Sequence, residues 1–151
     1  SLVGMVTGMV AGLATITPAS GFVGVPGGLI LGISGGILCY LAVDLIRGKL
    51  KIDDSLDVFA VHGVGGILGS LLVAVLALES FSGTGLSDGQ TASGQLLIQI
   101  FGVILVVVWT FVFTYIVLKI TSLFTPLRVE EDEEIEGLDL RSHGERSYFK
   151  D

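Results

Sequence analysis

Charge and cysteine are both scarce in this 151-residue sequence. Charged residues make up 15% of the chain, against about 25% in soluble domains. The single cysteine, Cys39, lies in an apolar run, which favours a small buried side chain and excludes an intrachain disulfide, a CxxC redox site and a cysteine-based metal cluster. The net charge is −7 and no basic face exists to neutralise phosphates, so we expect no nucleic-acid partner.

An initiator methionine and a signal peptide are also lacking. The sequence opens on Ser1 and passes at once into an apolar run. We therefore expect the chain to be the C-terminal part of a longer protein.

Long apolar runs dominate the sequence. Just over half of the residues are hydrophobic, and the mean hydropathy is +0.84. A hydrocarbon core about 30 Å thick needs roughly 20 mainly apolar residues per helix. Runs of this kind predict spans at residues 2–17, 27–46, 53–77 and 95–124. The fold class is therefore all-α, a polytopic membrane helix bundle over residues 1–125, followed by a separate charged tail over residues 126–151.

Lysine and arginine predict the orientation of these spans. The link between the second and third spans carries Arg47, Lys49 and Lys51, whereas the neighbouring links, residues 19–26 and 79–94, carry neither residue type. Cytoplasmic loops are enriched in lysine and arginine. We therefore expect a multi-pass protein of the cell membrane whose second link and C-terminus are cytoplasmic.

Glycines recur every four residues in the first three spans. The series are Gly4, Gly8 and Gly12, then Gly24, Gly28, Gly32 and Gly36, then Gly65 and Gly69. Small residues at this spacing let membrane helices approach one another closely. They predict a tightly packed bundle and by themselves say nothing about a substrate.

His62 is the histidine that falls inside a predicted span. At about 100° per residue it shares a helix face with Val58, Gly65 and Gly69, so we expect it to point into the bundle. An ionisable residue within a span is a candidate functional residue, here lining a transport pathway. A structural hydrogen bond between helices is the alternative. A metal site is less favoured, because no second histidine or cysteine lies at ligand spacing.

Three aspartates, Asp53, Asp54 and Asp57, open the third predicted span on its cytoplasmic side. Carboxylates at a helix start accept hydrogen bonds from free backbone N–H groups and complement the helix dipole, so we expect a capping role. A role at the cytoplasmic mouth, in cation exit or gating, is the alternative. Asp57 and His62 point about 140° apart on a helix, which disfavours a direct pair.

Thr17 and Pro18 interrupt the first predicted span. Pro18 has no backbone N–H and so stops or kinks a helix. Broken helices at membrane depth are tolerated where they are buried in protein or line a cavity. Thr17 therefore either lines a cavity or marks a helix end at the outer surface.

The tail, residues 126–151, carries more than half of the charged residues of the chain. Its acidic block, residues 130–136, is typical of a solvated or disordered segment, and Gly137 is suited to ending a short helix. Docking on the inner face of the body is the alternative. Four residues give the end of the tail its mixed charge and an aromatic ring: Arg141, His143, Arg146 and Tyr148.

Three stretches of the sequence carry a family resemblance. They are VAGLATITPASGFVGVPGGLILGISGG, IDDSLDVFAVHGVGGILGS and LRVEEDEEIEGLDLRSHGERSY. In this order and spacing they resemble the C-terminal part of ammonium transporters of the Amt/Mep/Rh family. Members of that family usually have eleven spans, so the chain resembles the last four spans and the cytoplasmic regulatory tail.

The resemblance implies that ammonium loses its proton at an outer vestibule and that ammonia crosses a hydrophobic pore lined by two hydrogen-bonded histidines. His62 matches the second histidine, Val58 a pore-lining aliphatic position and Thr17 a residue near the pore. The first histidine and the outer cation site belong to earlier spans. We therefore expect no selective conduction from these four helices alone.

The resemblance also implies partners. Family members form homotrimers, and some are blocked at the cytoplasmic face by PII-type nitrogen regulatory proteins. An Amt-like ammonium sensor that signals through its C-terminal tail is the alternative function. The sequence offers no nucleophile–base pair, metal cluster or phosphate loop, so we expect neither an enzyme nor a cofactor.

Overall fold

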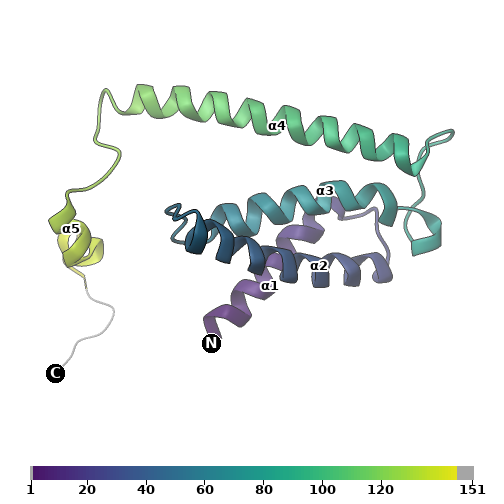
Figure 1. Ribbon diagram of the computed structural model, residues 1–151, viewed down its shortest axis with the longest axis horizontal. Helices are drawn as coiled ribbons and strands as arrows, with labels where there is room; N and C mark the ends of the chain where they lie inside the picture. Colours follow the sequence, from purple (N-terminus) through teal and green to yellow (C-terminus); the bar gives the residue numbers. More distant parts are fainter. Residues whose placement is uncertain (1, 146–151) are drawn as a thin grey trace. The chain divides into compact units, whose positions relative to one another are not determined.

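The computed structural model describes residues 2–145, and every regular element in this range is a helix or a helical turn (Figure 1). In chain order these are α1 (Leu2–Ile16), η1 (Thr17–Ala19), α2 (Val25–Val43), η2 (Asp44–Lys49), η3 (Phe59–Gly63), α3 (Val64–Leu76), η4 (Glu79–Phe81), α4 (Ala92–Thr121), α5 (Glu131–Glu136) and η5 (Asp139–His143). The elements η2, η3 and η5 are π-helical, and η1 and η4 are 3-10 turns.

Within residues 2–145, four helices are long and apolar enough to cross a membrane, as the sequence predicts. Their bounds are Leu2–Ala19, Val25–Lys49, Phe59–Leu76 and Ala92–Thr121. The largest difference from the predicted bounds is at the third, which begins at Phe59 rather than at residue 53. Residues 50–57 form turns instead, in which Lys51 and Asp57 have positive φ angles of 53° and 55°. The aspartates therefore precede the helix.

The chain divides into two compact units, Ser1–Val106 and Val107–Asp151. In the first unit α1, α2 and α3 all contact one another, and α1 runs obliquely across the other two (Figure 1). Two groups of buried apolar residues form the core of this unit: Ala19, Leu31, Val73, Leu76 and Ala77 in one, and Ala11, Cys39 and Val61 in the other.

Thr15 lies where the three helices cross. Its side chain is fully buried, and its hydroxyl donates to the carbonyl oxygen of Ala11 at 2.8 Å. A Cβ atom placed on Gly35 of α2 or Gly69 of α3 would collide with Thr15, and one on Gly65 would lie 2.9 Å from Thr15 Oγ1. Glycine at these positions is what allows α2 and α3 to close around Thr15.

The buried row on α2 lies one residue away from the glycine series that the sequence suggests. The buried residues are Gly27, Leu31, Gly35 and Cys39, whereas a Cβ atom on Gly32 or Gly36 would meet nothing within 4 Å. The series makes close approaches as well: a Cβ atom on Gly24 would collide with Ser82, one on Gly28 would lie 3.3 Å from Ile16 Cδ1, and one on Gly12 would lie 3.7 Å from Gly32 Cα. The prediction of close helix packing is therefore right, and on α2 two neighbouring rows take part in it.

The link that follows α3 folds back over the first unit. The backbone N–H of Thr84 donates to the carbonyl oxygen of Phe22 at 3.0 Å, and that of Gly85 donates to Ala77 at 2.8 Å. Phe81 and Leu86 pack against the larger core group. This link thus closes one end of the three-helix body and ties it to the link after α1.

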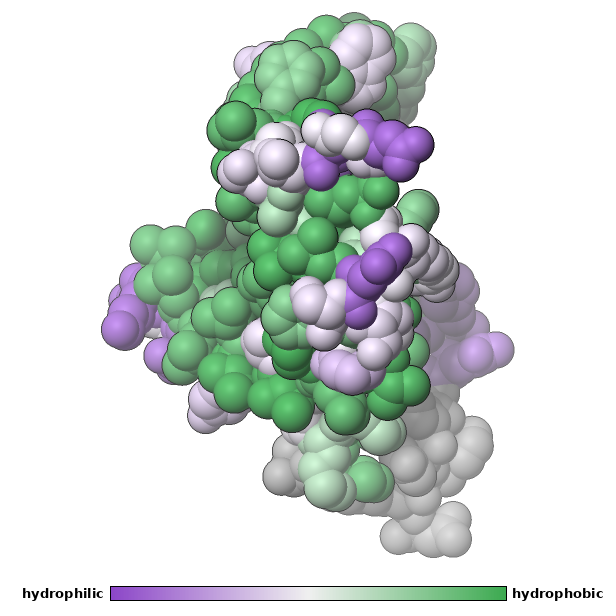
Figure 2. Space-filling model, turned by 90° about the vertical axis from the view of Figure 1, so that its right-hand side faces the viewer, coloured by the Kyte–Doolittle hydropathy of each residue, from purple (hydrophilic) through white to green (hydrophobic). Residues whose placement is uncertain are grey.

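The helix α4 buries none of its residues in the described chain. Its most prominent side-chain contact is internal, with the rings of Trp109 and Phe113 stacked at 4.1 Å between centroids. Hydrophobic side chains cover much of the face shown in Figure 2. Such a surface is expected of helices that meet lipid or further helices rather than water.

Candidate functional site

His62 lies in the π-helical turn η3, at the start of the third span. Its side chain is exposed in the described chain, as are those of Val58 and Phe59, while Ala60 and Val61 are buried. The buried face of the three-helix body therefore does not include His62, although a regular α-helix would place it beside the buried Gly65 and Gly69; its orientation toward a pathway stays a prediction. Within this chain, the exposed imidazole of His62 has exposed apolar residues earlier in the same turn, among them Val58 and Phe59.

The π-helical turn explains the difference. The backbone N–H of Val64 donates to the carbonyl oxygen of Phe59, five residues earlier. A turn closed in this way holds one more residue than an α-helical turn. The buried row of α3 therefore continues from Gly65 to Val61 and Ala60 and leaves His62 on another side. Single π-helical turns within α-helices are frequent at functional sites.

Asp54 caps the third span. Its two carboxylate oxygens accept the backbone N–H groups of Val58 at 2.8 Å and Ala60 at 3.0 Å. These are among the first N–H groups of a helix, which have no partner inside it. The cap therefore fixes the turn that immediately precedes His62.

The carboxylates of the other two aspartates have further partners. Asp53 accepts a hydrogen bond from the hydroxyl of Ser55 at 2.7 Å. Asp57 forms an ion pair with Arg47, with 3.0 Å between Nη1 and Oδ1. Asp54 therefore bonds to the helix start through its carboxylate, whereas Asp57 pairs with a residue of the preceding span.

Replacing Asp54 with alanine is expected to destabilise the protein by about 1–2 kcal/mol, because two backbone N–H groups lose their acceptor. Ser55→Ala is the matched control, since its hydroxyl bonds to Asp53 within the turn, and we expect less than half of the effect. Thermal unfolding of the detergent-solubilised full-length protein measures both. An equal fall in the unfolding temperature of the two variants would contradict the capping role.

Thr17 is exposed at the end of the first span. Its hydroxyl donates to the carbonyl oxygen of Leu13 at 2.7 Å. The next residue, Pro18, lies beside Gly69, because a Cβ atom on Gly69 would be 3.2 Å from Pro18 Cδ. Gly69 is seven residues beyond His62, or about 10 Å along a helix. Thr17 and His62 therefore lie at different heights along the axis of α3, about 10 Å apart.

The described residues leave few chemical options at this site. Among residues 2–145, no group of three or more histidine, cysteine, aspartate or glutamate side chains is placed to hold a metal ion. His62 instead offers one ring nitrogen that donates and one that accepts, next to apolar neighbours. A group of this kind suits hydrogen bonding to a small polar molecule.

Comparison with known proteins decides the family. The model of the Ammonium Transporter Family matches residues 1–148. The chain belongs to the ammonium transporter family. Its resemblance to the Amt/Mep/Rh proteins, seen in three stretches of sequence, is thereby confirmed.

Individual ammonium transporters match over almost the whole chain. Ammonium transporter Amt1 of Archaeoglobus fulgidus is 46% identical over 147 residues, which are 96% of this chain and 37% of the relative. The ammonium transporter of Bacillus subtilis is 41% identical over 150 residues, 98% of this chain and 37% of the relative. The chain thus spans little more than a third of the length of these multi-pass membrane transporters.

A solved structure has the same fold. The protein named "Sensor Amt Protein" superposes with a TM-score of 0.81 at 35% identity, over 93% of this chain and 34% of that chain. The all-helical arrangement is therefore that of the corresponding part of an Amt protein.

The buried Thr15 is a feature of this ammonium transporter chain that the sequence reasoning missed. A signal for it exists, because Ala11, Thr15 and Ala19 repeat every four residues and all three are buried. The glycines at positions 4, 8 and 12 are a more conspicuous series on the same helix. Gly12 of that series approaches Gly32 of α2, so each series supplies packing contacts.

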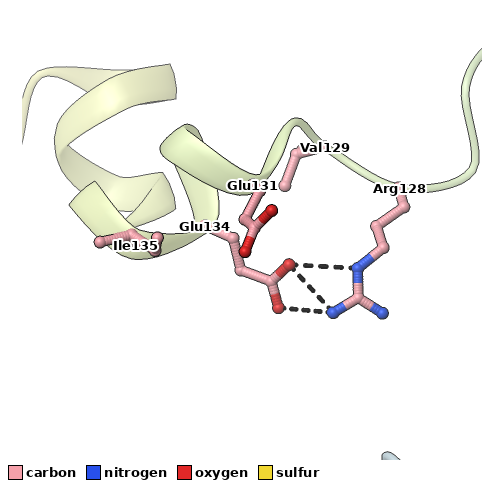
Figure 3. A pocket seen from close by; sticks show the side chains of 5 residues that line it. All are labelled: Arg128, Val129, Glu131, Glu134 and Ile135. Atoms are coloured by element: carbon pink, nitrogen blue, oxygen red, sulfur yellow. Dashed lines mark hydrogen bonds and ion pairs between the residues drawn. The ribbon is translucent and has the colours of Figure 1, made fainter.

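The charged tail contains a short helix and paired charges. As expected, α5 ends before Gly137, which has a φ angle of 99°. Figure 3 shows the guanidinium of Arg128 turned toward the carboxylate of Glu134, with a shortest distance of 2.6 Å. Arg141 lies 3.5 Å from both Glu133 and Glu136. The acidic block is thus partly neutralised within the tail, and the expected contributions of Arg146 and Tyr148 lie outside the described residues.

Proposed function

We propose that this chain supplies part of the conduction pathway of an ammonium transporter. The observation that carries the proposal is His62, an imidazole at the start of an apolar span that, like Val58, is left uncovered by the chain's own helices. Together with the family membership, it supports a pathway lined by His62 and Val58, with Thr17 nearer the other end. The remaining wall would come from spans that this chain does not contain.

The proposed chemistry follows from solvation. A cation in an apolar pore costs several kcal/mol or more, whereas a neutral molecule costs far less. Ammonium would therefore leave its proton at the entrance, and ammonia would pass. Ammonia has three N–H donors and one lone pair, and a neutral imidazole can accept from it or donate to it. His62 would replace hydrogen bonds that ammonia loses on leaving water.

Ammonium uptake into liposomes that hold the full-length protein tests this proposal. His62→Ala is expected to lower the uptake rate about tenfold or more, the effect of roughly 1.4 kcal/mol on the barrier. His143→Ala is the matched control, because it removes the other histidine of the chain, which lies in the tail. Unchanged uptake and unchanged selectivity in His62→Ala would contradict the pathway assignment.

The tail and the assembly are part of the same proposal. A cytoplasmic C-terminus is supported by Arg47, Lys49 and Lys51 in the link between the second and third spans. The tail would then meet a PII-type regulatory protein at the cytoplasmic face of a homotrimer in the cell membrane. Aspartates Asp53, Asp54 and Asp57 would lie at the cytoplasmic mouth of the pathway.

An ammonium sensor is the second candidate function. It is favoured by the structural match to the protein named "Sensor Amt Protein". A sensor would bind ammonium and change the tail without net flux. Ammonium-dependent changes in amide hydrogen exchange over residues 126–145, together with no uptake by the wild-type protein in liposomes, would support the sensor over the transporter.

A further inference from the structure

Arg47 connects the end of the second span with the start of the third. It lies in η2, and its Nη1 donates to Oδ1 of Asp57 at 3.0 Å. The side chain of Asp57 is 19% exposed and that of Arg47 is 49% exposed. The carboxylate is therefore the more enclosed partner, and its charge depends on Arg47 for compensation.

Asp57 sets the direction in which the chain enters the third span. Its φ angle of 55° lies in the left-handed region, which few residues other than glycine adopt, although aspartate and asparagine do so more readily. Its carbonyl oxygen accepts the N–H of Val61 at 2.8 Å, and Val58 follows it directly. A change of backbone direction at Asp57 would therefore displace both Val58 and His62.

His62 lies between two fixed points. Beyond it, the glycines of α3 hold the helix against Thr15. Before it, the Asp54 cap and the Arg47–Asp57 ion pair together hold the first turn. The π-helical turn that carries His62 breaks the regular pattern of α-helical hydrogen bonds. The rotation of this turn about the helix axis therefore depends on both fixed points.

We propose that Arg47 is a positioning residue for the pathway. It holds Asp57 in the left-handed conformation from which the helix of Val58 and His62 starts, and thereby fixes the direction of the His62 imidazole. Arg47 itself touches no substrate. The inference rests on the proposed function for its effect on transport, but not for its effect on the backbone.

Amide hydrogen exchange of the full-length protein tests the backbone part. Arg47→Met keeps most of the side-chain length and removes the charge, and we expect exchange within residues 54–63 to rise about fivefold, as for loss of one partly enclosed ion pair. Lys49→Met is the matched control, because it removes a charge from the same π-helical turn at a residue with no ion pair among those described. Equal exchange in the two variants would overturn the proposal.

Transport kinetics in liposomes test the link to His62. In Arg47→Met the maximal rate of ammonium uptake should fall about fivefold with KM unchanged, because the ion pair acts on geometry rather than on recruitment of the substrate. Arg47→Lys should restore most of the rate, since a lysine ammonium can still reach a single carboxylate oxygen. A rate unchanged in Arg47→Met, or a rate that Arg47→Lys does not improve, would overturn the positioning role.

Asp57→Asn separates the charge from the backbone conformation. Asparagine tolerates positive φ as aspartate does, so this variant should reproduce the Arg47→Met rate, and combining the two should lower it no further. If the two effects multiply instead, the residues act independently and the proposal fails. If His62→Ala leaves uptake unchanged, the proposed function fails, while hydrogen exchange still decides whether Arg47 holds this turn.

Discussion

Gly69→Ala is expected to prevent the first and third spans from packing and to leave little folded protein in the membrane. A Cβ atom on Gly69 would overlap the carbonyl oxygen of Thr15 and lie 3.2 Å from Cδ of Pro18. One obstacle is backbone and the other is a rigid ring, so no side-chain rotation relieves the overlap. The helices would have to separate, at a cost of about 3 kcal/mol or more.

The neighbouring Gly66 supplies the control. A Cβ atom there would meet nothing within 4 Å in the described chain, and alanine is favoured over glycine inside a helix by about 1 kcal/mol. Gly66→Ala should therefore be extracted from membranes in wild-type amounts and unfold at the same temperature or slightly above. Fluorescence-detected gel filtration after heating measures both variants. A wild-type melting temperature for Gly69→Ala would show that α1 and α3 do not approach as closely as described.

The packing of this body was only partly predictable from the sequence. The spacing of Gly65 and Gly69 correctly indicates a close approach of the third span, because no other residue allows backbones to come so near. On α2 the sequence offers two neighbouring rows, since Gly27 is followed by Gly28 and Gly35 by Gly36, and the row that is buried is the one with fewer glycines. Only contacts with a second helix distinguish the rows, and a periodicity argument contains no such information.

The face of His62 was beyond prediction for a different reason. A helical wheel assumes one rotation per residue throughout the helix, and the π-helical turn η3 breaks that assumption just where the histidine lies. The sequence did show that a histidine begins an apolar span and that aspartates precede it. The pairing of Asp57 with Arg47 joins residues from different spans, and residue spacing along one helix cannot show such a contact.

Gly35→Ala carries the second largest expected effect on stability. Unlike the overlap in Gly69→Ala, the overlap in Gly35→Ala can be removed by a second substitution. A Cβ atom on Gly35 would meet the side chain of Thr15, colliding with Oγ1 and lying 2.7 Å from Cβ and 3.1 Å from Cγ2. All three obstacles are side-chain atoms. The single substitution should destabilise the protein by about 2–3 kcal/mol, whereas Gly36→Ala, which would meet nothing within 4 Å, should not destabilise it.

Removing the side chain of Thr15 from α1 while adding a methyl group at Gly35 of α2 should recover much of the lost stability. The double variant Thr15→Gly with Gly35→Ala removes every atom that the new Cβ would strike, while a methyl group still occupies part of the crossing. Glycine within α1 itself costs about 1 kcal/mol, so the double variant should unfold between Gly35→Ala and the wild type. Thr15→Gly should give no such recovery with Gly69→Ala, because the carbonyl oxygen of residue 15 remains in place. Equal recovery of both glycine variants, or of neither, would contradict the distinction between a side-chain and a backbone obstacle at this crossing.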